Sequence, residues 1–209
     1  MALLITVFVV FVLLCLGEIW WRKKKVHGEV SRKFIHITVG SFVAFWPFFL
    51  SWNQIKLLSL AFLIVVAISR YLRIFQAIHS VNRPTWGELY FAVAVGGVAF
   101  MTHNKWIYMV ALLQMSLADG LAAIIGVRYG KHQRYSILGQ VKSVIGTATF
   151  VIVSFCLLVA YRFLGQASLG VLAMLGLALA AGLIENIGVF GLDNLFVPLL
   201  IAAALRLMS

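Results

Sequence analysis

The sequence has few acidic residues and few cysteines for its length. Aspartate and glutamate together occur six times in 209 residues, against seventeen lysines and arginines, and cysteine occurs twice. Both cysteines lie within apolar runs, so nothing indicates a disulfide framework, and the scattered histidines lack the spacing of a zinc site. So few carboxylates do not serve solubility, and each of their positions therefore carries information.

The sequence also has too few polar residues for a soluble domain. Its residues are 63% hydrophobic and its mean hydropathy is +1.04, whereas about half of a soluble domain is usually apolar. Each of eight apolar segments is close to the ~20 residues that a helix needs to cross a bilayer. The segments are 2–21, 34–50, 54–72, 87–102, 106–127, 144–164, 168–184 and 194–208. They predict an all-α, polytopic transmembrane helical bundle of about seven or eight spans.

The loops between these segments differ in positive charge. The odd-numbered loops carry thirteen of the seventeen lysines and arginines, and basic residues are enriched on the cytoplasmic side of membrane proteins. This distribution places the odd-numbered loops in the cytoplasm and both termini outside. The net charge of +11 is explained by this topology and by anionic lipid head groups, without nucleic acid. Since every carboxylate except Glu18 lies at or near the same face, we expect a site there for a charged, water-soluble ligand.

Asp119 lies inside an apolar segment, in the stretch "SLADGLAAIIGVRYGKH". It is about nine residues before Arg128, which puts it roughly 13 Å below that end of a straight helix. An ionisable group at that depth is costly and usually faces a cavity or a partner. One interpretation is a metal-ligating or proton-accepting carboxylate. The other is a carboxylate paired with a buried arginine, beside a small-residue packing ridge formed by Ala123, Gly126 and Gly130.

The second apolar segment begins with polar residues, in "SRKFIHITVG". Arg32 and His36 are four residues apart and therefore share one face of a helix. A basic anchor at the membrane surface explains Arg32 and Lys33. It does not explain His36, which is already inside the apolar run.

Two later stretches have patterns that are typical of helix starts. In "RPTWGELYF", Thr85 and Glu88 have the spacing of a capping box, and Arg83 can equally pair with Glu88. In "GQVKSVIGTATF", a lysine and a hydroxyl, Lys142 and Ser143, precede an apolar run. Backbone N–H groups at a helix start, with these side chains, suit an anion. An ordinary helix start explains the pattern equally well.

The last polar stretch is "ENIGVFGLDNLFVPLL". Asp193 in this stretch is explained either as a functional residue or as a simple N-cap of the next helix. Glu185 and Asn186, at the end of a span, have no such structural explanation. Elsewhere, "GVRYGKH" lacks the G-x-x-x-x-G-K-[ST] spacing of a Walker A loop, so that class of nucleotide site is excluded.

In their order, these motifs resemble those of the dolichol kinase, phytol kinase and CTP-dependent diacylglycerol kinase family. The order is R-K-x-x-H, R-x-x-x-G-E, A-D-G-x-A-x-x-x-G-x-x-x-G-K, K-S-x-x-G-T, E-N and G-x-D-N-x-x-x-P. The matching residues are Arg32, Lys33, His36, Arg83, Gly87, Glu88, Asp119, Gly120, Ala122, Gly126, Gly130, Lys131, Lys142, Ser143, Gly146, Thr147, Glu185, Asn186, Gly191, Asp193, Asn194 and Pro198. The chain departs from the pattern at Ile145, where many relatives carry an acidic residue.

The resemblance implies an integral membrane kinase with its active-site face in the cytoplasm. Such an enzyme transfers the γ-phosphate of CTP, or of another nucleotide, to a lipid alcohol such as polyprenol, dolichol, phytol or diacylglycerol. Its partners are the nucleoside triphosphate, the lipid alcohol and the bilayer. We divide the chain into an N-terminal transmembrane anchor with its basic loop (1–30) and a multi-span catalytic membrane domain (31–209). A phosphatidate cytidylyltransferase and a transporter are the alternatives, although the absence of an internal repeat favours an enzyme.

Phosphoryl transfer requires cations on the phosphates, a divalent metal on carboxylates and a group that orients the hydroxyl. The catalytic residues that we predict are Asp119, Lys33, His36 and Glu88. The predicted nucleotide- and phosphate-binding residues are Arg32, Lys33, Gly126, Gly130, Lys131, Lys142, Ser143, Gly146 and Thr147. For Mg²⁺, which prefers oxygen ligands, we predict Asp119, Glu185 and Asp193. Further motif residues are Arg83, Asn186 and Asn194.

Overall fold

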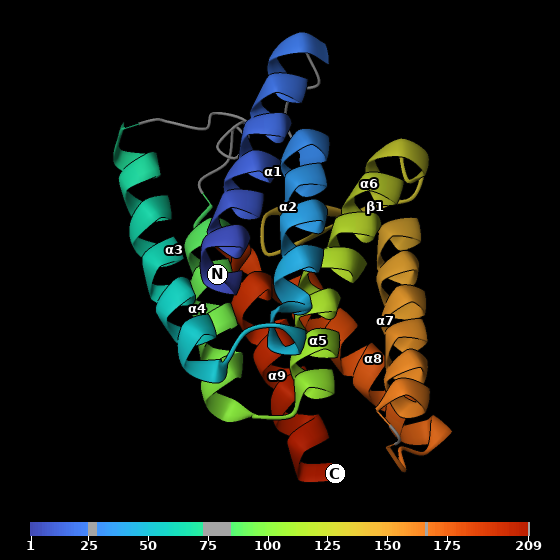
Figure 1. Cartoon of the computed structure of the whole chain (residues 1–209). Helices are drawn as coiled ribbons and strands as arrows, with labels where there is room; N and C mark the ends of the chain where they lie inside the picture. The colour runs from blue at the N-terminus through green and yellow to red at the C-terminus, as the bar shows by residue number, and fades with distance from the viewer. Residues whose placement is uncertain (25–28, 73–84, 166, 209) are drawn as a thin grey trace.

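The computed structural model describes residues 1–24, 29–72, 85–165 and 167–208, and it is built almost entirely of helices. The α-helices are α1 (Ala2–Lys24), α2 (Glu29–Ala44), α3 (Trp52–Leu72), α4 (Gly87–Met101), α5 (Lys105–Leu113), α6 (Asp119–Tyr129), α7 (Val144–Leu164), α8 (Val171–Ile187) and α9 (Asp193–Met208). Short 3-10 turns follow α2 and α8, at η1 (Trp46–Phe48) and η3 (Val189–Gly191). Figure 1 shows α3 at one flank of the bundle and α7 at the other. The predicted helical bundle is confirmed.

Several of these helices have the length and composition of membrane spans. Within the described residues, four helical stretches are long and apolar enough to cross a membrane. They are Ala2–Trp20, Trp52–Leu72, Lys105–Tyr129 and Val144–Leu164, and the shorter apolar helices are Gly87–Met101 and Val171–Ile187. The membrane class follows from these helices. The number of seven or eight spans and the cytoplasmic side of the loops stay predictions.

The third long stretch contains a π-helical turn, η2 (Gln114–Ala118), between α5 and α6. A π-turn inserts an extra residue into a helix and is often found at functional sites. Here the turn ends directly before Asp119, whose backbone N–H points back to the carbonyls of Gln114 and Ser116. The segment that we predicted as one span is therefore a single helical path with a wider turn directly before Asp119.

A short β-hairpin between α6 and α7 adds an element that the sequence did not predict to the helical bundle. Strands β1 (Arg134–Ile137) and β2 (Gln140–Ser143) pair antiparallel, with Arg134 opposite Ser143. The connecting residues Leu138 and Gly139 both have positive φ, at 49° and 77°. Ser143 ends the hairpin and caps α7, because its Oγ accepts a hydrogen bond from the Gly146 N–H at 3.1 Å. The hairpin and the start of α7 are thus one structural unit.

Helix α6 packs between α2 and α7 through its small residues. A side chain at Gly120 would overlap Ile37 of α2. At Gly126, a Cβ would lie 2.8 Å from Ser143 Oγ and 3.2 Å from Gly146 Cα. Gly120 therefore packs against α2, whereas Gly126 of the predicted ridge packs against the start of α7. Helix α9 packs against α4 and α8 and completes the surroundings of the site.

Candidate active site

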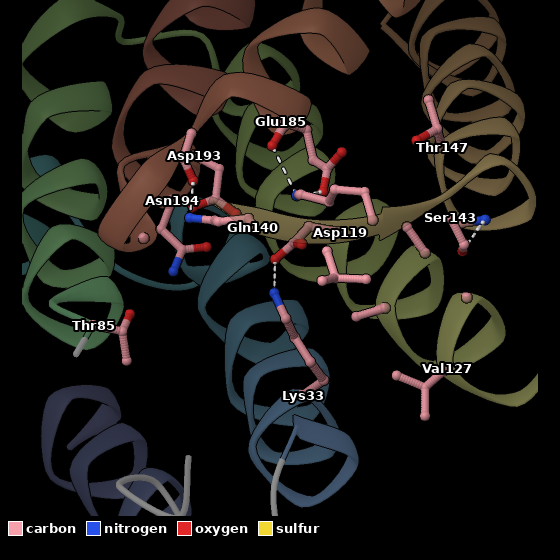
Figure 2. A pocket seen from close by; sticks show the side chains of 18 of the residues that line it. Lys33, Thr85, Asp119, Val127, Gln140, Ser143, Thr147, Glu185, Asp193 and Asn194 are labelled. Carbon is pink, nitrogen blue, oxygen red and sulfur yellow. Dashed lines mark hydrogen bonds and ion pairs between the residues drawn. The ribbon is translucent and has the colours of Figure 1, made fainter. Parts of the chain in front are cut away.

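A polar cavity of about 320 Å³ lies among α2, α6, the hairpin, α7 and the α8–α9 turn (Figure 2). Its lining gathers residues from five motifs that are far apart in the sequence. The predicted site residues that line it are Arg32, Lys33, Asp119, Gly126, Lys142, Ser143, Gly146, Thr147, Glu185, Asp193 and Asn194. Such a concave site with convergent polar groups is where a ligand is expected.

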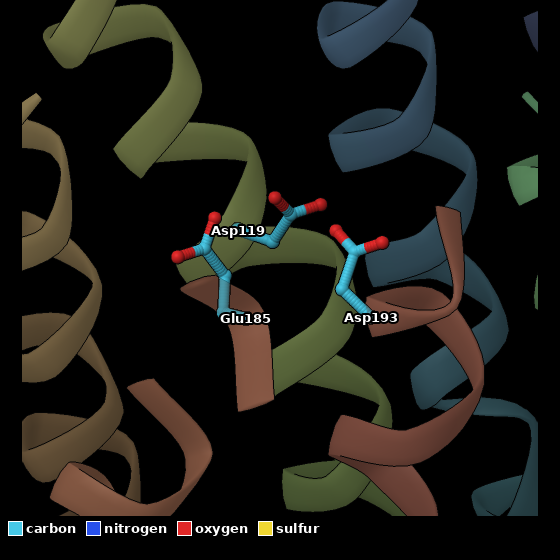
Figure 3. Close-up of side chains that lie close together, drawn as sticks. All are labelled: Asp119, Glu185 and Asp193. Carbon is cyan, nitrogen blue, oxygen red and sulfur yellow. The ribbon is translucent and has the colours of Figure 1, made fainter. Parts of the chain in front are cut away.

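Three carboxylates form a cluster at this cavity (Figure 3). Asp119 begins α6, Glu185 lies near the end of α8, and Asp193 begins α9. One oxygen from each carboxylate lies within 4.8 Å of the others, and both Asp119 and Glu185 are buried. Carboxylates this close repel one another unless a cation neutralises them. The residues predicted for Mg²⁺ are therefore brought together in a geometry that suits a divalent cation.

Lysine and histidine side chains of α2 reach the first of these carboxylates. Lys33 forms an ion pair with Asp119 across 86 residues of sequence, and both side chains are buried. His36 Nε2 lies 3.8 Å from the same Asp119 oxygen and 3.0 Å from the carbonyl oxygen of Met115. Because a carbonyl only accepts, Nε2 of His36 donates this hydrogen bond. The partner of Asp119 is thus a lysine, where the alternative interpretation expected an arginine.

Lys142 of β2 reaches the second carboxylate. Its ammonium group forms an ion pair with Glu185 and donates to the Glu185 backbone carbonyl at 2.9 Å. Burial by itself lowers the pKa of Lys142, but the carboxylates of Glu185 and Asp193 outweigh this effect and raise the pKa above its ordinary value. Lys142 therefore carries its positive charge at neutral pH.

Behind the wall of the cavity at the start of α7, hydroxyl and amide groups of β1, α7 and α8 form a hydrogen-bonded cluster. Tyr135 of β1 places its hydroxyl 2.5 Å from both Thr147 Oγ1 and Asn186 Oδ1. Asn186 is itself held by a hydrogen bond from its Nδ2 to the Gly182 carbonyl, at 3.0 Å. Tyr135 was not predicted from the sequence, yet its hydroxyl ties the hairpin to α7 and α8. Unlike Tyr135, Arg134 and Gln140 line the cavity itself, and neither was predicted.

The remaining predicted residues lie elsewhere. Lys131 is exposed and is not among the residues that line the polar cavity, and Gly130 packs against Ser143 beside it. His36 and Glu88 line a second, apolar cavity. Arg83 lies outside the described residues.

The capping box predicted for Thr85 and Glu88 is wrong. Helix α4 begins at Gly87 and has no side-chain cap, while Thr85 Oγ1 accepts from the Gly87 N–H at 3.2 Å. Because Trp86 occupies the N-cap position, Thr85 lies one residue before it, and Glu88 is the second helical residue where a capping box needs the third. Within the described part of the chain, neither carboxylate oxygen of Glu88 accepts a hydrogen bond.

A comparison with known proteins finds a relative over most of the chain. Over 180 residues, the chain is 34% identical to a phytol kinase from Synechocystis sp., and the match covers 82% of this chain and 76% of that protein. No family model matches the chain, and no solved structure matches it. The similarity thus extends well beyond the short motifs that line the cavity.

Proposed function

Because the chain belongs to the lipid-alcohol kinase family that includes phytol kinase, we propose that it transfers the γ-phosphate of CTP to an isoprenoid alcohol such as phytol. Polyprenol, dolichol and diacylglycerol are the other acceptors of this chemical class, and UTP and ATP are the other donors. The observation that carries the proposal is the polar cavity, in which three close carboxylates face lysines and the start of α7. Phosphoryl transfer by positioning and charge neutralisation needs this combination.

The metal in this proposal is Mg²⁺, held by Asp119, Glu185 and Asp193. These residues offer the oxygen ligands that Mg²⁺ prefers, and their oxygens lie close enough together to share one ion. A bound Mg²⁺ supplies neutralisation of phosphate charge. Lys33 and Lys142, which already pair with two of the three carboxylates, add positive charge on the phosphate side of the same cavity.

The reaction exchanges one phosphorus–oxygen bond for another. The alcohol oxygen bonds to the γ-phosphorus, the bond from that phosphorus to the β-phosphate oxygen breaks, and the nucleoside diphosphate leaves. The hydroxyl proton passes to a carboxylate of the site and then to water. In this proposal Asp119, which is buried at the start of α6, meets an acceptor that arrives from the lipid. His36 orients groups beside it, since its Nε2 hydrogen is already donated to Met115.

The α7 start and the hairpin form the phosphate-binding side in this proposal. Ser143, Gly146 and Thr147 lie at a helix N-terminus, where backbone N–H groups and the helix dipole favour anions. Arg32 and Lys142 add positive charge from α2 and β2. The exposed Lys131 next to this wall is available to a nucleotide as it enters, on the side that the charge distribution assigns to the cytoplasm.

The direct test incubates the purified protein with Mg²⁺, γ-labelled CTP and a panel of phytol, polyprenol, dolichol and diacylglycerol. Matched reactions use UTP and ATP. Label in a phosphorylated lipid is the expected result, and it names the donor and acceptor. Release of label as pyrophosphate with phosphatidate as acceptor would identify a cytidylyltransferase instead. No transfer to any acceptor by folded protein would overturn the kinase proposal in favour of a transporter.

A further inference from the structure

A second cavity, almost wholly apolar, lies beside the polar one. It is formed by side chains of four helices, among them Leu14 of α1, Val39 of α2, Val66 of α3 and Phe91 of α4. Three polar side chains also line it, those of Arg32, His36 and Glu88. Arg32 lines the polar cavity as well, so the two cavities share a wall.

Glu88 is chemically out of place in such a cavity. Its side chain is only 9% exposed, and among the described residues its carboxylate oxygens accept no hydrogen bond. Arg70 Nη1 lies 3.8 Å from Glu88 Oε2, beyond hydrogen-bond distance, and it donates its hydrogen bond to the Thr85 carbonyl oxygen at 2.6 Å. A buried carboxylate without a donor is costly. Among the described residues, none of the N–H groups that line the cavity donates to this carboxylate, so a ligand with an O–H would supply the missing hydrogen bond.

The apolar cavity reaches to the edge of the reaction site. The His36 ring packs edge-on against Phe91, with ring centroids 5.2 Å apart. The same His36 has its Nε2 3.8 Å from the Asp119 carboxylate. A molecule in the apolar cavity that contacts His36 is therefore separated from the carboxylate cluster by a single side chain.

We propose that this cavity binds the hydroxyl end of the lipid alcohol and that Glu88 accepts the hydrogen bond of its hydroxyl. The inference rests on the proposed function, and it adds where the acceptor sits and which part of it is selected. The cavity volume is about 50 Å³, which at 10–15 Å³ for each water-sized group holds roughly four methylene-sized groups. Only the first carbons of the alcohol enter, and the remaining tail stays with the lipid.

Two substitutions at neighbouring positions of α3 test the cavity. Val66 lines it and is 5% exposed, whereas Val65 is 50% exposed on the outer face. Val66→Phe adds volume inside the cavity, and Val65→Phe adds the same volume outside it. If Val66→Phe displaces two methylene-sized groups, the KM for the alcohol rises roughly 15-fold. The KM for the nucleotide stays unchanged, which also shows that the variant is folded.

Glu88→Gln tests the polar contact. Loss of a hydrogen bond to a charged group should raise the KM for the alcohol roughly 10- to 100-fold, again without changing nucleotide binding. Val66→Ala is a second substitution at position 66. It enlarges the cavity and should therefore improve the use of alcohols that have a branch near the hydroxyl. Within each variant, alcohols that share their first carbons but differ in tail length should have the same KM, when compared at equal mole fraction in the micelle.

The outcomes separate this inference from the proposed function. If the unmodified protein transfers no label to any alcohol, the proposed function fails and the inference fails with it. If the unmodified protein is active but Val66→Phe and Val65→Phe have the same KM for the alcohol, the inference alone is refuted. The same holds if Glu88→Gln changes the KM for the nucleotide and leaves that for the alcohol unaltered. Should Val66→Phe not fold, unchanged acceptor preference in Val66→Ala decides against the cavity.

Discussion

Substitution of Asp119, which forms an ion pair with Lys33, should affect both the stability of the protein and the rate of transfer, and the two effects can be measured separately. Their side chains are 3% and 6% exposed, and removal of one partner from a buried pair usually costs about 3–5 kcal/mol. Asp119→Asn leaves Lys33 charged, but it also relieves repulsion within the carboxylate cluster. We therefore expect a loss of unfolding free energy near the lower end, about 3 kcal/mol. The loss of a charged group from the reaction site should lower kcat roughly 100- to 1000-fold.

A double variant distinguishes the loss of stability from the loss of activity. When Lys33→Met is combined with Asp119→Asn, neither partner of the ion pair is left with an unpaired charge, so most of the lost unfolding free energy should return. Transfer should stay as low as in Asp119→Asn, because the carboxylate is still missing. Thermal unfolding in detergent micelles measures the first quantity, and transfer of labelled γ-phosphate to the alcohol measures the second. If the double variant regained both stability and transfer, Asp119 would be a structural partner of Lys33, and its assignment as a metal ligand would be wrong.

Two further predictions concern the metal and the close approach of α6 to α7. Chelation should stop transfer and added Mg²⁺ should restore it, and Glu185→Gln should raise the Mg²⁺ requirement at least roughly 10-fold; an unaltered Mg²⁺ titration in that variant would contradict the assignment. Gly126→Ala should cost about 1–3 kcal/mol of stability, because its Cβ would lie 2.8 Å from Ser143 Oγ and 3.2 Å from Gly146 Cα. The control Gly176→Ala, in α8 with nothing within 4 Å, should stabilise by up to about 1 kcal/mol; equal unfolding temperatures for the two variants would show that α6 has room to move.

The helices were predictable from the sequence because long apolar runs have few other structures available in a bilayer. The two departures arise where that signal is weak. The strands of the hairpin are four residues each, which is too short for the alternation of apolar and polar residues to be recognised. They are also polar, whereas the helices of this chain were predicted from apolar runs. The π-turn depends on tertiary packing, since a side chain at Gly40 of α2 would overlap Ser116 within it.

The candidate site was predictable to the extent that its residues contrast with their neighbours. Asp119, Glu185 and Lys142 are charges within or beside apolar runs, where each needs a reason, and the structure places all three at one cavity. Tyr135 has no such contrast, because it stands in a polar loop among residues of the same kind. The pairing of Asp119 with Lys33 was also hidden, since 86 residues separate them and no local pattern relates one to the other.

The charges of the cavity suggest why a metal and a nucleotide belong together there. Three carboxylates face four cations, Arg32, Lys33, Arg134 and Lys142, which leaves a charge of about +1 without a ligand. Mg²⁺ alone would raise this charge to about +3, and a nucleoside triphosphate with about four negative charges would alone lower it to about −3, whereas the two together would leave about −1. An uncompensated charge is costly in a partly buried site, so in the proposed function the two ligands would stabilise one another by binding as a pair. The alcohol proposed for the apolar cavity beside them is neutral and would bring no charge into the membrane.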